Sequence, residues 1–369
     1  MNKKPDLSQI NLTIPCHWNS NVINKILNAN HGEIRIAEVY GVLSDGNPVG
    51  HGRAKNTVVS ISREKALNFR LYLKKIGLKF TYLLNAPFDF NGNQEQLNKL
   101  DEYLNWIINT LKPDALTISS LDLMKYVRKI DSKIPIYIST IAGIKSIGDL
   151  KPFMDIKPSR VIPHHDIGKR WYELKELVEY GKKNLFSVEM MTTESCLFEC
   201  PNRKKHYKYL IKENKDSPFH SNCNSKKLTY PREYLLAGGI IRPEDIVFYK
   251  EMGINFFKIT GRSQSASWLP MVVKAYQKMK HKGNLIRLLD INPAMHAEKL
   301  IYLDNNSLDG FLRNFPQMGY QDTVKYCDEW MVKLYNKKKF KISDQSIYST
   351  EGNSLILKKA GKRVSAFFD

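Results

Sequence analysis

Short apolar runs alternate with longer amphipathic segments along most of the chain. The apolar runs lie at residues 11–15, 33–40, 79–84, 115–119, 134–139, 160–162, 184–189 and 255–259. The segments between them carry apolar residues at helical spacing, as in residues 62–75, 94–111 and 267–280. Strands that alternate with helices in this way are typical of parallel βα units. The pattern therefore predicts an α/β protein built from eight such units.

Eight units within residues 10–290 predict a (β/α)8 TIM-like barrel, because a barrel of this type takes about 250 residues. An open, doubly wound sheet is the alternative, since periodicity does not show closure. The glycine-bearing loop at residues 41–53, GVLSDGNPVGHGR, lacks the G-x-G-x-x-G spacing of a dinucleotide fold. The βα rhythm stops after residue 290. We therefore expect residues 291–369 to form a C-terminal extension that packs on the barrel.

Three basic residues lie at the carboxyl ends of predicted strands. Active sites of such barrels are built at this end. Arg53 lies in the loop after the second strand, and Lys258 and Arg262 end the eighth. A guanidinium pairs bidentately with carboxylate or phosphate, so we predict that these residues bind an anionic group of a substrate. The alternative is that the two arginines cap loops or pair with Glu38 and Glu189.

Candidate proton carriers lie at the same end of the predicted barrel. Glu38 belongs to the second strand, His164 follows the sixth, and Glu189 ends the seventh. Carboxylates and imidazoles are the usual general acids and bases, so these residues are the candidate catalytic groups. His164 is followed directly by His165. Because neighbours on a strand point to opposite faces, we expect at most one of the two to face the pocket.

Three of the five cysteines lie in one polar segment that follows the seventh predicted strand. Cys196 and Cys200 form a C-x3-C pair, and Cys223 lies 23 residues after Cys200. Thiolates suit zinc or iron–sulfur clusters, and clustered thiols in a reducing compartment indicate a metal rather than disulfides. Ordinary buried thiols are the alternative, since free cysteine behaves as a small hydrophobe. The segment therefore predicts a metal site.

A fourth ligand is needed for tetrahedral zinc or for a four-cysteine cluster. Cys327, in the extension, and Cys16, at the end of the first strand, are the two remaining thiols. His206 and His220 could complete a zinc site instead. The sequence does not separate these possibilities.

The net charge and the lack of long apolar runs limit the kinds of partner that the protein can bind. The formal charge is +20, which suits an anionic partner such as RNA or a carboxylate-rich metabolite. The lysines are spread over many segments and the aromatic residues do not interleave with them, so a solvated basic surface is the alternative. No apolar run approaches the ~20 residues that span a bilayer, and the N-terminus has no apolar signal core. We therefore expect a cytoplasmic protein without membrane insertion. A protein partner is possible, and the sequence does not identify one.

Three passages give the chain a likeness to a known family. They are EVYGVLSDGNPVGHGR at residues 38–53, ESCLFECPNRKKHY at 194–207 and FFKITGRSQSASWLPMVVKAYQ at 256–277. Together they resemble the peptidase U32 family, a group of collagenase-like barrel proteins. The resemblance implies a barrel fold. It also implies a protease label for some members, and for others oxygen-independent hydroxylation of ubiquinone precursors or of RNA bases.

The resemblance further implies a 4Fe–4S cluster held by four cysteines. Cys196, Cys200 and Cys223 match the cysteine loop, and we predict Cys327 as the fourth ligand with Cys16 as its rival. The cysteine spacing departs from that of the better-known branches. Our leading hypothesis is iron–sulfur-dependent, oxygen-independent hydroxylation or a related modification of an anionic or aromatic substrate. The alternatives are a peptidase, an RNA-base modification protein and a zinc-stabilised binding module. The peptidase has neither a nucleophile–base pair nor an H-E-x-x-H motif to support it.

Overall fold

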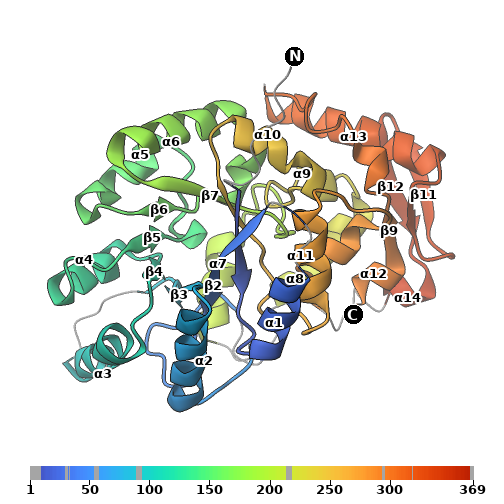
Figure 1. Cartoon of the computed structure of the whole chain (residues 1–369). Coiled ribbons are helices and arrows are strands. Elements are labelled where there is room, and N and C mark those ends of the chain that lie inside the picture. The colour runs from blue at the N-terminus through green and yellow to red at the C-terminus, as the bar shows by residue number, and fades with distance from the viewer. Residues whose placement is uncertain are drawn as a thin grey trace.

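The computed structural model of the 369-residue chain describes residues 10–29, 32, 34–53, 58–88, 94–212, 218–292, 296–317 and 319–365. Eight parallel strands form a closed barrel in sequence order, with the last strand pairing with the first (Figure 1). The strands are β1 (Asn11–Pro15), β2 (Arg35–Gly41), β3 (Lys79–Leu84), β4 (Ala115–Ile118), β5 (Ile136–Ile138), β6 (Arg160–Val161), β7 (Ser187–Met191) and β8 (Phe256–Lys258). The predicted (β/α)8 barrel is confirmed, and the open sheet is wrong.

Helices connect successive strands and surround the barrel (Figure 1). They are α1 (Ser20–Asn28), α2 (Arg63–Lys75), α3 (Gln94–Asn105) with a π-helical continuation (Trp106–Leu111), α4 (Leu121–Ile130), α5 (Ile147–Leu150), α6 (Trp171–Asn184), α10 (Ile246–Glu251) and α11 (Trp268–Gln277). Asn19, Ser62 and Ser120 cap α1, α2 and α4 by accepting a hydrogen bond from a backbone N–H of the first turn. Such caps satisfy donors that the helix itself leaves unpaired.

Strand β7 starts later than the sequence pattern indicated. We expected a strand over residues 184–189, but Asn184 is the last residue of α6, and Leu185 caps that helix in the left-handed conformation with a φ of 61°. The strand therefore runs from Ser187 to Met191, and the cysteine segment follows its end more closely than the sequence pattern indicated.

The connection from β7 to β8 holds three helices that the sequence pattern did not predict. They are α7 (Arg203–Lys212), α8 (Pro218–Thr229) and α9 (Glu233–Leu236), which precede α10. Their hydrophobic residues are sparse, because α7 reads RKKHYKYLIK and α8 reads PFHSNCNSKKLT. Apolar periodicity is the main signal for a helix, so its weakness here explains the omission.

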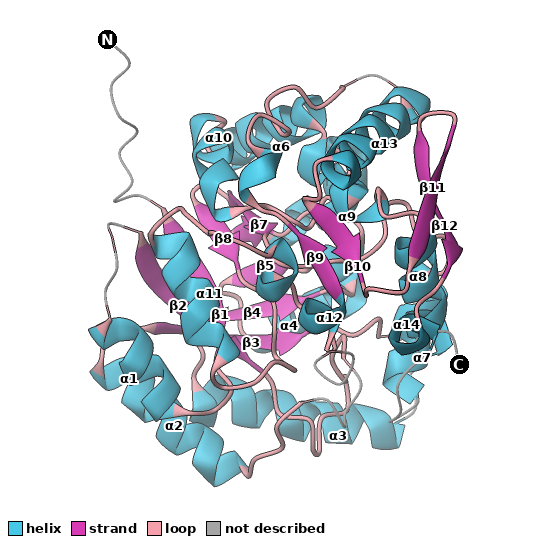
Figure 2. Cartoon of the chain, turned by 90° about the vertical axis from the view of Figure 1, so that its right-hand side faces the viewer, coloured by secondary structure: helices cyan, strands magenta, loops and turns pink. Residues whose placement is uncertain are grey.

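The residues after 290 form small sheets and helices outside the barrel. They comprise α12 (Ala297–Leu300), β9 (Ile301–Leu303), α13 (Tyr320–Asn336), β10 (Phe340–Ile342), β11 (Ile347–Glu351), β12 (Ser354–Lys359) and α14 (Lys362–Ser365). The β11–β12 hairpin lies beside α13 and α8 (Figure 2). Arg232 pairs with Asp328 of α13 at 2.9 Å, and the Tyr348 hydroxyl donates to the Leu228 carbonyl at 2.8 Å. These contacts join the segment to the β7–β8 connection. No helix in the described part of the chain is long and apolar enough to cross a membrane.

A charged layer lies inside the barrel, where branched apolar side chains usually dominate. Arg160 of β6 is 3.3 Å from Glu38 of β2 and 3.5 Å from Glu189 of β7. Its guanidinium carbon is 4.2 Å from the centroid of the Tyr137 ring and 3.8 Å from that of Phe256. A buried charge is tolerated when it is paired, and Arg160 has both its carboxylate partners within the barrel itself. Arg160 Nε and Glu189 Oε2 have no hydrogen-bond partner among the described residues.

Candidate functional site

A pocket of about 350 Å³ lies at the carboxyl ends of the strands. Seven of the eight strands contribute a lining residue at or just beyond their carboxyl end: Tyr40, Leu83, Thr117, Ser139, Ile162, Met191 and Lys258. The segment after β7, with α7 and α8, supplies another part of the wall. The pocket is therefore enclosed between the barrel and the cysteine segment.

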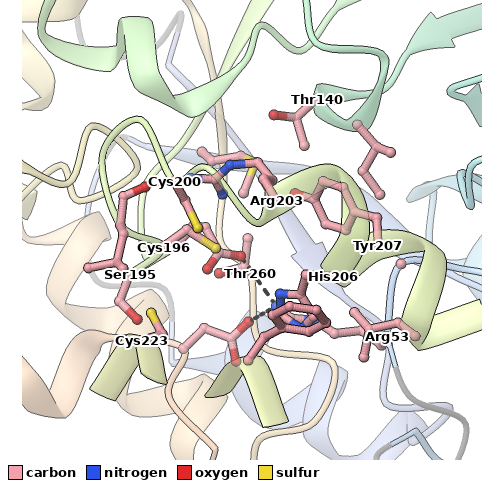
Figure 3. A pocket seen from close by; sticks show the side chains of 18 of the residues that line it. Arg53, Thr140, Ser195, Cys196, Cys200, Arg203, His206, Tyr207, Cys223 and Thr260 are labelled. Carbon is pink, nitrogen blue, oxygen red and sulfur yellow. Dashed lines mark hydrogen bonds and ion pairs between the residues drawn. The ribbon is translucent and has the colours of Figure 1, made fainter. Parts of the chain in front are cut away.

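Cys196, Cys200 and Cys223 all line this pocket (Figure 3). Cys196 and Cys200 lie in the loop before α7, whereas Cys223 lies within α8. Burial, followed by the charge of Glu194, raises the pKa of the Cys196 thiol to about 12, although the nearby Arg203 opposes the shift. A thiol with so high a pKa is a weak nucleophile at neutral pH. The structure brings the three predicted ligands to one pocket.

The loop between the first two cysteines is anchored on a buried carboxylate. Asp166 accepts a hydrogen bond from the Glu199 backbone N–H at 3.1 Å and lies 3.7 Å from Arg203. Arg203 in turn hydrogen-bonds to Cys196 and donates to the Leu197 carbonyl. Asp166 therefore acts on the position of the thiols through two separate contacts.

His164 supports this anchor and does not line the pocket. Its Nδ1 is 3.2 Å from Asp166, and Lys145 is 2.9 Å from the same carboxylate oxygen. Burial alone would raise the pKa of Asp166. His164, and after it His165 and Lys145, nevertheless hold this pKa well below its usual range. The structure does not bring His164 to the pocket, where the predicted role in proton transfer would require it.

The expectation that His164 and His165 point to opposite faces is wrong. Strand β6 ends at Val161, and His164 caps a 3-10 helix that begins at His165, so strand alternation does not apply. The two rings stack with centroids 4.5 Å apart, and both side chains are buried. Ligand atoms of the two histidines and Asp166 lie within 4.8 Å of one another. Lys145 and Arg203 already neutralise Asp166, which disfavours a cation there.

Of the three predicted anion-binding residues, Arg262 has the most available donor. It lines the pocket, and its Nη1 is buried without a hydrogen-bond partner among the described residues. Burial lowers the pKa of Arg262 to about 10. A buried cation with an unpaired donor is costly, and an anionic ligand would relieve that cost.

Lys258 lies between this pocket and the charged layer below it. Its ammonium nitrogen is 4.0 Å from the centroid of the Tyr40 ring, which is part of the pocket wall. Burial lowers the pKa of Lys258, while the charges of Glu189 and Glu38 act in the opposite direction. The ammonium group can therefore contribute to the electrostatics of both regions.

Arg53 lines the pocket but is already paired. It forms ion pairs with Asp290 and with Glu194, the latter at 3.4 Å. These carboxylates raise the pKa of Arg53 despite its burial, which alone would lower it. The alternative of an ion-paired arginine is thus correct for Arg53, although its partners are not the predicted Glu38 and Glu189.

Glu38 and Glu189 lie in the barrel interior and are not among the residues that line the described pocket. Arg160 holds both carboxylates, and Glu38 also accepts from the Thr81 hydroxyl at 2.5 Å. Burial and the neighbouring Glu189 raise the pKa of Glu38, while Arg160 opposes the shift. Arg160 engages both carboxylates below the pocket, so the structure does not bring these two predicted proton carriers to the pocket.

Neither candidate for the fourth cysteine ligand lines the described pocket. Cys327 is fully buried in α13, near Lys169, and burial raises its pKa to about 12. Cys16 is buried beside Gly41 and Trp18 at the end of β1. The structure therefore places Cys327 away from the ligand set that we predicted, because the apolar face of α13 that carries it packs into the core.

Histidine 206 lines the pocket, whereas the side chain of His220 lies outside the described residues. No cysteine belongs to a group of three side chains that could hold a metal ion in the ranges that the structure describes. The sulfur atoms around a single tetrahedral zinc would lie about 4 Å apart, given a Zn–S bond of about 2.3 Å. The cysteines of the described ranges are therefore not gathered as the ligands of one zinc ion would be.

Two carboxylates of the pocket were missing from the predicted site. Glu194 lies three residues beyond the end of β7, and this position after a strand was the available signal. Asp290 comes from the segment after α11, where no motif marks it. It forms an isolated bridge with Glu194 and accepts from Gln264 at 3.1 Å.

Comparison with known proteins finds two relatives in sequence, one named a protease and one named a tRNA hydroxylation protein, and a similar solved structure. An uncharacterized protease of Methanocaldococcus jannaschii is 28% identical over 271 residues, which cover 71% of this chain and 78% of the relative. The tRNA hydroxylation protein P of Helicobacter pylori is 23% identical over 318 residues, covering 77% of this chain and 70% of the relative. A solved structure of the U32 peptidase Mk0906 superposes with a TM-score of 0.48 and 10% identity, covering 71% of this chain and 96% of that chain.

The model of peptidase family U32 matches residues 61–285, which extend from α2 to the segment after α11 and include the whole cysteine segment. The match covers more than half of the chain, and it agrees with the resemblance carried by the sequence passages. This chain therefore belongs to peptidase family U32.

Proposed function

We propose that the chain is an iron–sulfur-dependent hydroxylase that works without molecular oxygen on an anionic substrate, with an RNA base as the favoured substrate. The observation that carries the proposal is the convergence of Cys196, Cys200 and Cys223 on the pocket that also exposes the unpaired donor of Arg262. Soft sulfur donors suit an iron–sulfur cluster, and a guanidinium suits the anionic group.

The cysteines would hold the cluster, which supplies electron transfer at the pocket when bound. In the overall reaction, a C–H bond of the substrate becomes a C–OH bond. The oxygen comes from an organic donor that bears a hydroxyl group. The C–O bond of the donor breaks, and the hydroxyl group passes to the substrate. The donor carbon receives the hydrogen and the two electrons that the substrate loses. Arg262 and Lys258 would hold the anionic group of the donor or of the substrate.

Two observations favour RNA. One relative is named a tRNA hydroxylation protein. In addition, Lys226, Lys227 and Arg203 line the pocket together with Arg262 and Lys258, in a chain with a formal charge of +20. Basic residues near a pocket attract the phosphate backbone, and this attraction weakens as salt rises. A small anionic aromatic molecule is the alternative substrate, and the apolar side chains in the pocket wall, such as Leu83, Ile162 and Met191, would accommodate a ring of either kind.

A peptidase finds less support, although the family and one relative bear that label. The pKa of the Cys196 thiol is raised, and Arg203 rather than a histidine hydrogen-bonds to it. A cysteine nucleophile needs a lowered pKa or an adjacent base.

The test is production of the chain in an anaerobically grown host that lacks an RNA hydroxylase of its own, followed by mass spectrometry of nucleosides from its tRNA. We expect a nucleoside heavier by one oxygen atom with the native chain. It should be absent with a variant in which Cys196, Cys200 and Cys223 are all replaced by alanine. Equal levels in both samples would contradict the proposal, and hydroxylation of small aromatic acids alone would redirect it to the alternative substrate.

A further inference from the structure

We propose that helix α7 is an RNA-binding element whose outer face holds the phosphate backbone of a single-stranded RNA loop while a base of that loop enters the pocket. This inference rests on the proposed function, since it concerns the substrate of the same pocket. It names the form of RNA that the site takes and the surface that holds it.

Helix α7 has two chemically different faces. Arg203 and Tyr207, four residues apart, line the pocket and form its inner face (Figure 3). Lys204, Lys205 and Lys208 are exposed on the other side of the helix. The helix is therefore a wall that separates the pocket from a row of lysines in solvent.

The outer lysines carry charge that the protein does not neutralise. In the described part of the chain, Lys204, Lys205 and Lys208 are in no ion pair. The ten residues of α7 include five lysine or arginine residues and no aspartate or glutamate. Lys204 and Lys208 are four residues apart, and like charges at this spacing repel each other. A phosphate bound across them would relieve that repulsion.

The two lysines of α8 that line the pocket are engaged within the protein. Lys226 pairs with Glu233 at 3.4 Å. Lys227 is buried and donates to the Ser195 hydroxyl at 3.3 Å. The unpaired lysines that the structure describes in the β7–β8 connection are therefore those of α7.

The position of α7 favours a single-stranded loop over a duplex. A base in the pocket and phosphates on the outer lysines would lie on two sides of one helix, which is about 10–12 Å wide with its side chains. Unstacked bases of a loop can turn away from their backbone in this way. Enzymes that modify a base act on single-stranded nucleic acid or turn the base out of its stack. A loop meets both requirements without the breaking of base pairs.

A membrane surface fits this face less well than RNA does. A helix that lies on a bilayer buries an apolar face in it. The aromatic side chains of α7 are instead packed inside the protein, where the rings of His206 and Tyr209 lie 5.5 and 6.0 Å from that of Phe219 on α8. The side chains of α7 that the structure shows as exposed are lysines, which match phosphates.

The test measures binding of a fluorescent, unmodified tRNA transcript to the full-length chain, reconstituted with iron and sulfide without oxygen, at several salt concentrations. Each phosphate contact to a single strand adds about 0.7 to the slope of log affinity against log salt. A variant with Lys204→Ala, Lys205→Ala and Lys208→Ala should therefore lose about 2 from this slope. It should bind about a hundredfold more weakly at about 0.1 M salt, with the iron content of the native chain. Arginine at the same three positions should restore the native slope.

The matched control removes three exposed lysines at the opposite end of the barrel. Lys74 and Lys75 end α2, and Lys79 begins β3, so all three lie at the amino ends of the strands. Their replacement by alanine should leave the slope within about 0.7 of the native value.

A native slope in the α7 alanine variant, or an equal loss in the control, would overturn the inference and leave the proposed function standing. Binding of the native chain to phosphatidylserine vesicles but not to tRNA would also overturn it. A native chain that binds tRNA through α7 yet forms no hydroxylated nucleoside would instead overturn the proposed function.

Discussion

Two buried charged regions lie one above the other in this barrel, and they differ in how their charges are balanced. In the interior, Arg160 is paired with Glu38 and Glu189 and stacked between two aromatic rings. In the pocket above, Arg262 keeps a buried donor without a partner among the described residues, beside the three thiols. The interior cation is ion-paired with two carboxylates of the protein, although Arg160 Nε and Glu189 Oε2 have no hydrogen-bond partner among the described residues. The Arg262 donor instead lies in a pocket that can take a ligand.

The comparison teaches that burial and a shifted pKa do not by themselves mark a functional residue. Glu38 has a raised pKa, yet its partners are all structural. Structural ion-pair networks perturb pKa values as catalytic sites do. What separates the two regions is the pairing of each charge, and Lys258 lies between them.

The largest expected effect is loss of the cluster. Replacing Cys196, Cys200 or Cys223 singly by alanine should remove most of the bound iron from the anaerobically purified chain, because each thiol lines the pocket. Cys16→Ser should leave the iron content unchanged. Iron analysis of the four variants checks this, and a Cys223→Ala variant with full iron would remove α8 from the site.

A large loss of stability is expected from the interior layer. Arg160→Leu leaves Glu38 and Glu189 buried together without a cation, and breaking a buried pair in this way costs about 3–5 kcal/mol in free energy of unfolding. Urea denaturation measures it. Arg63→Leu, which removes a more exposed pair with Glu102, should cost less than about 1 kcal/mol. Similar losses in both variants would mean that the interior layer is not self-contained.

An intermediate effect is expected at the anion subsite. Arg262→Ala should weaken binding of an aromatic carboxylate by roughly ten- to a hundredfold, because a hydrogen bond to a charged group contributes about 1.5–3 kcal/mol. Calorimetric titration of the cluster-loaded chain measures the affinity. The exposed Arg287 offers a control, and Arg287→Ala should bind as the native chain does. Unchanged affinity in Arg262→Ala would assign the anion to other residues.

The smallest effect concerns the anchor of the cysteine loop. Asp166→Asn keeps an acceptor for the Glu199 N–H but loses the ion pairs with Lys145 and Arg203. Residues that support metal ligands typically affect metal affinity by about 10–100-fold, and we expect about tenfold here. Iron release to a chelator measures it, with the exposed Asp155→Asn as control. Identical release rates would show that Asp166 does not position the thiols.

Regular periodicity made the barrel predictable, while the site was predictable only in part. The three clustered cysteines and Arg262 could be found because they follow strand ends, and strand ends meet in a barrel. Arg160 could not be assigned to Glu38 and Glu189, because the pairing joins residues from three strands and depends on which way each side chain points. Cys327 was misplaced since nothing in the helical pattern of α13 tells how that helix is oriented on the barrel.

The central claim is that Cys196, Cys200 and Cys223 hold an iron–sulfur cluster in the pocket above the barrel. Purification of the chain without oxygen, with iron and sulfide analysis and EPR of the reduced protein, tests it most directly. The account predicts about four iron and four sulfide ions per chain and an EPR signal typical of a 4Fe–4S cluster. A colourless, iron-free protein that carries one zinc ion per chain would contradict it.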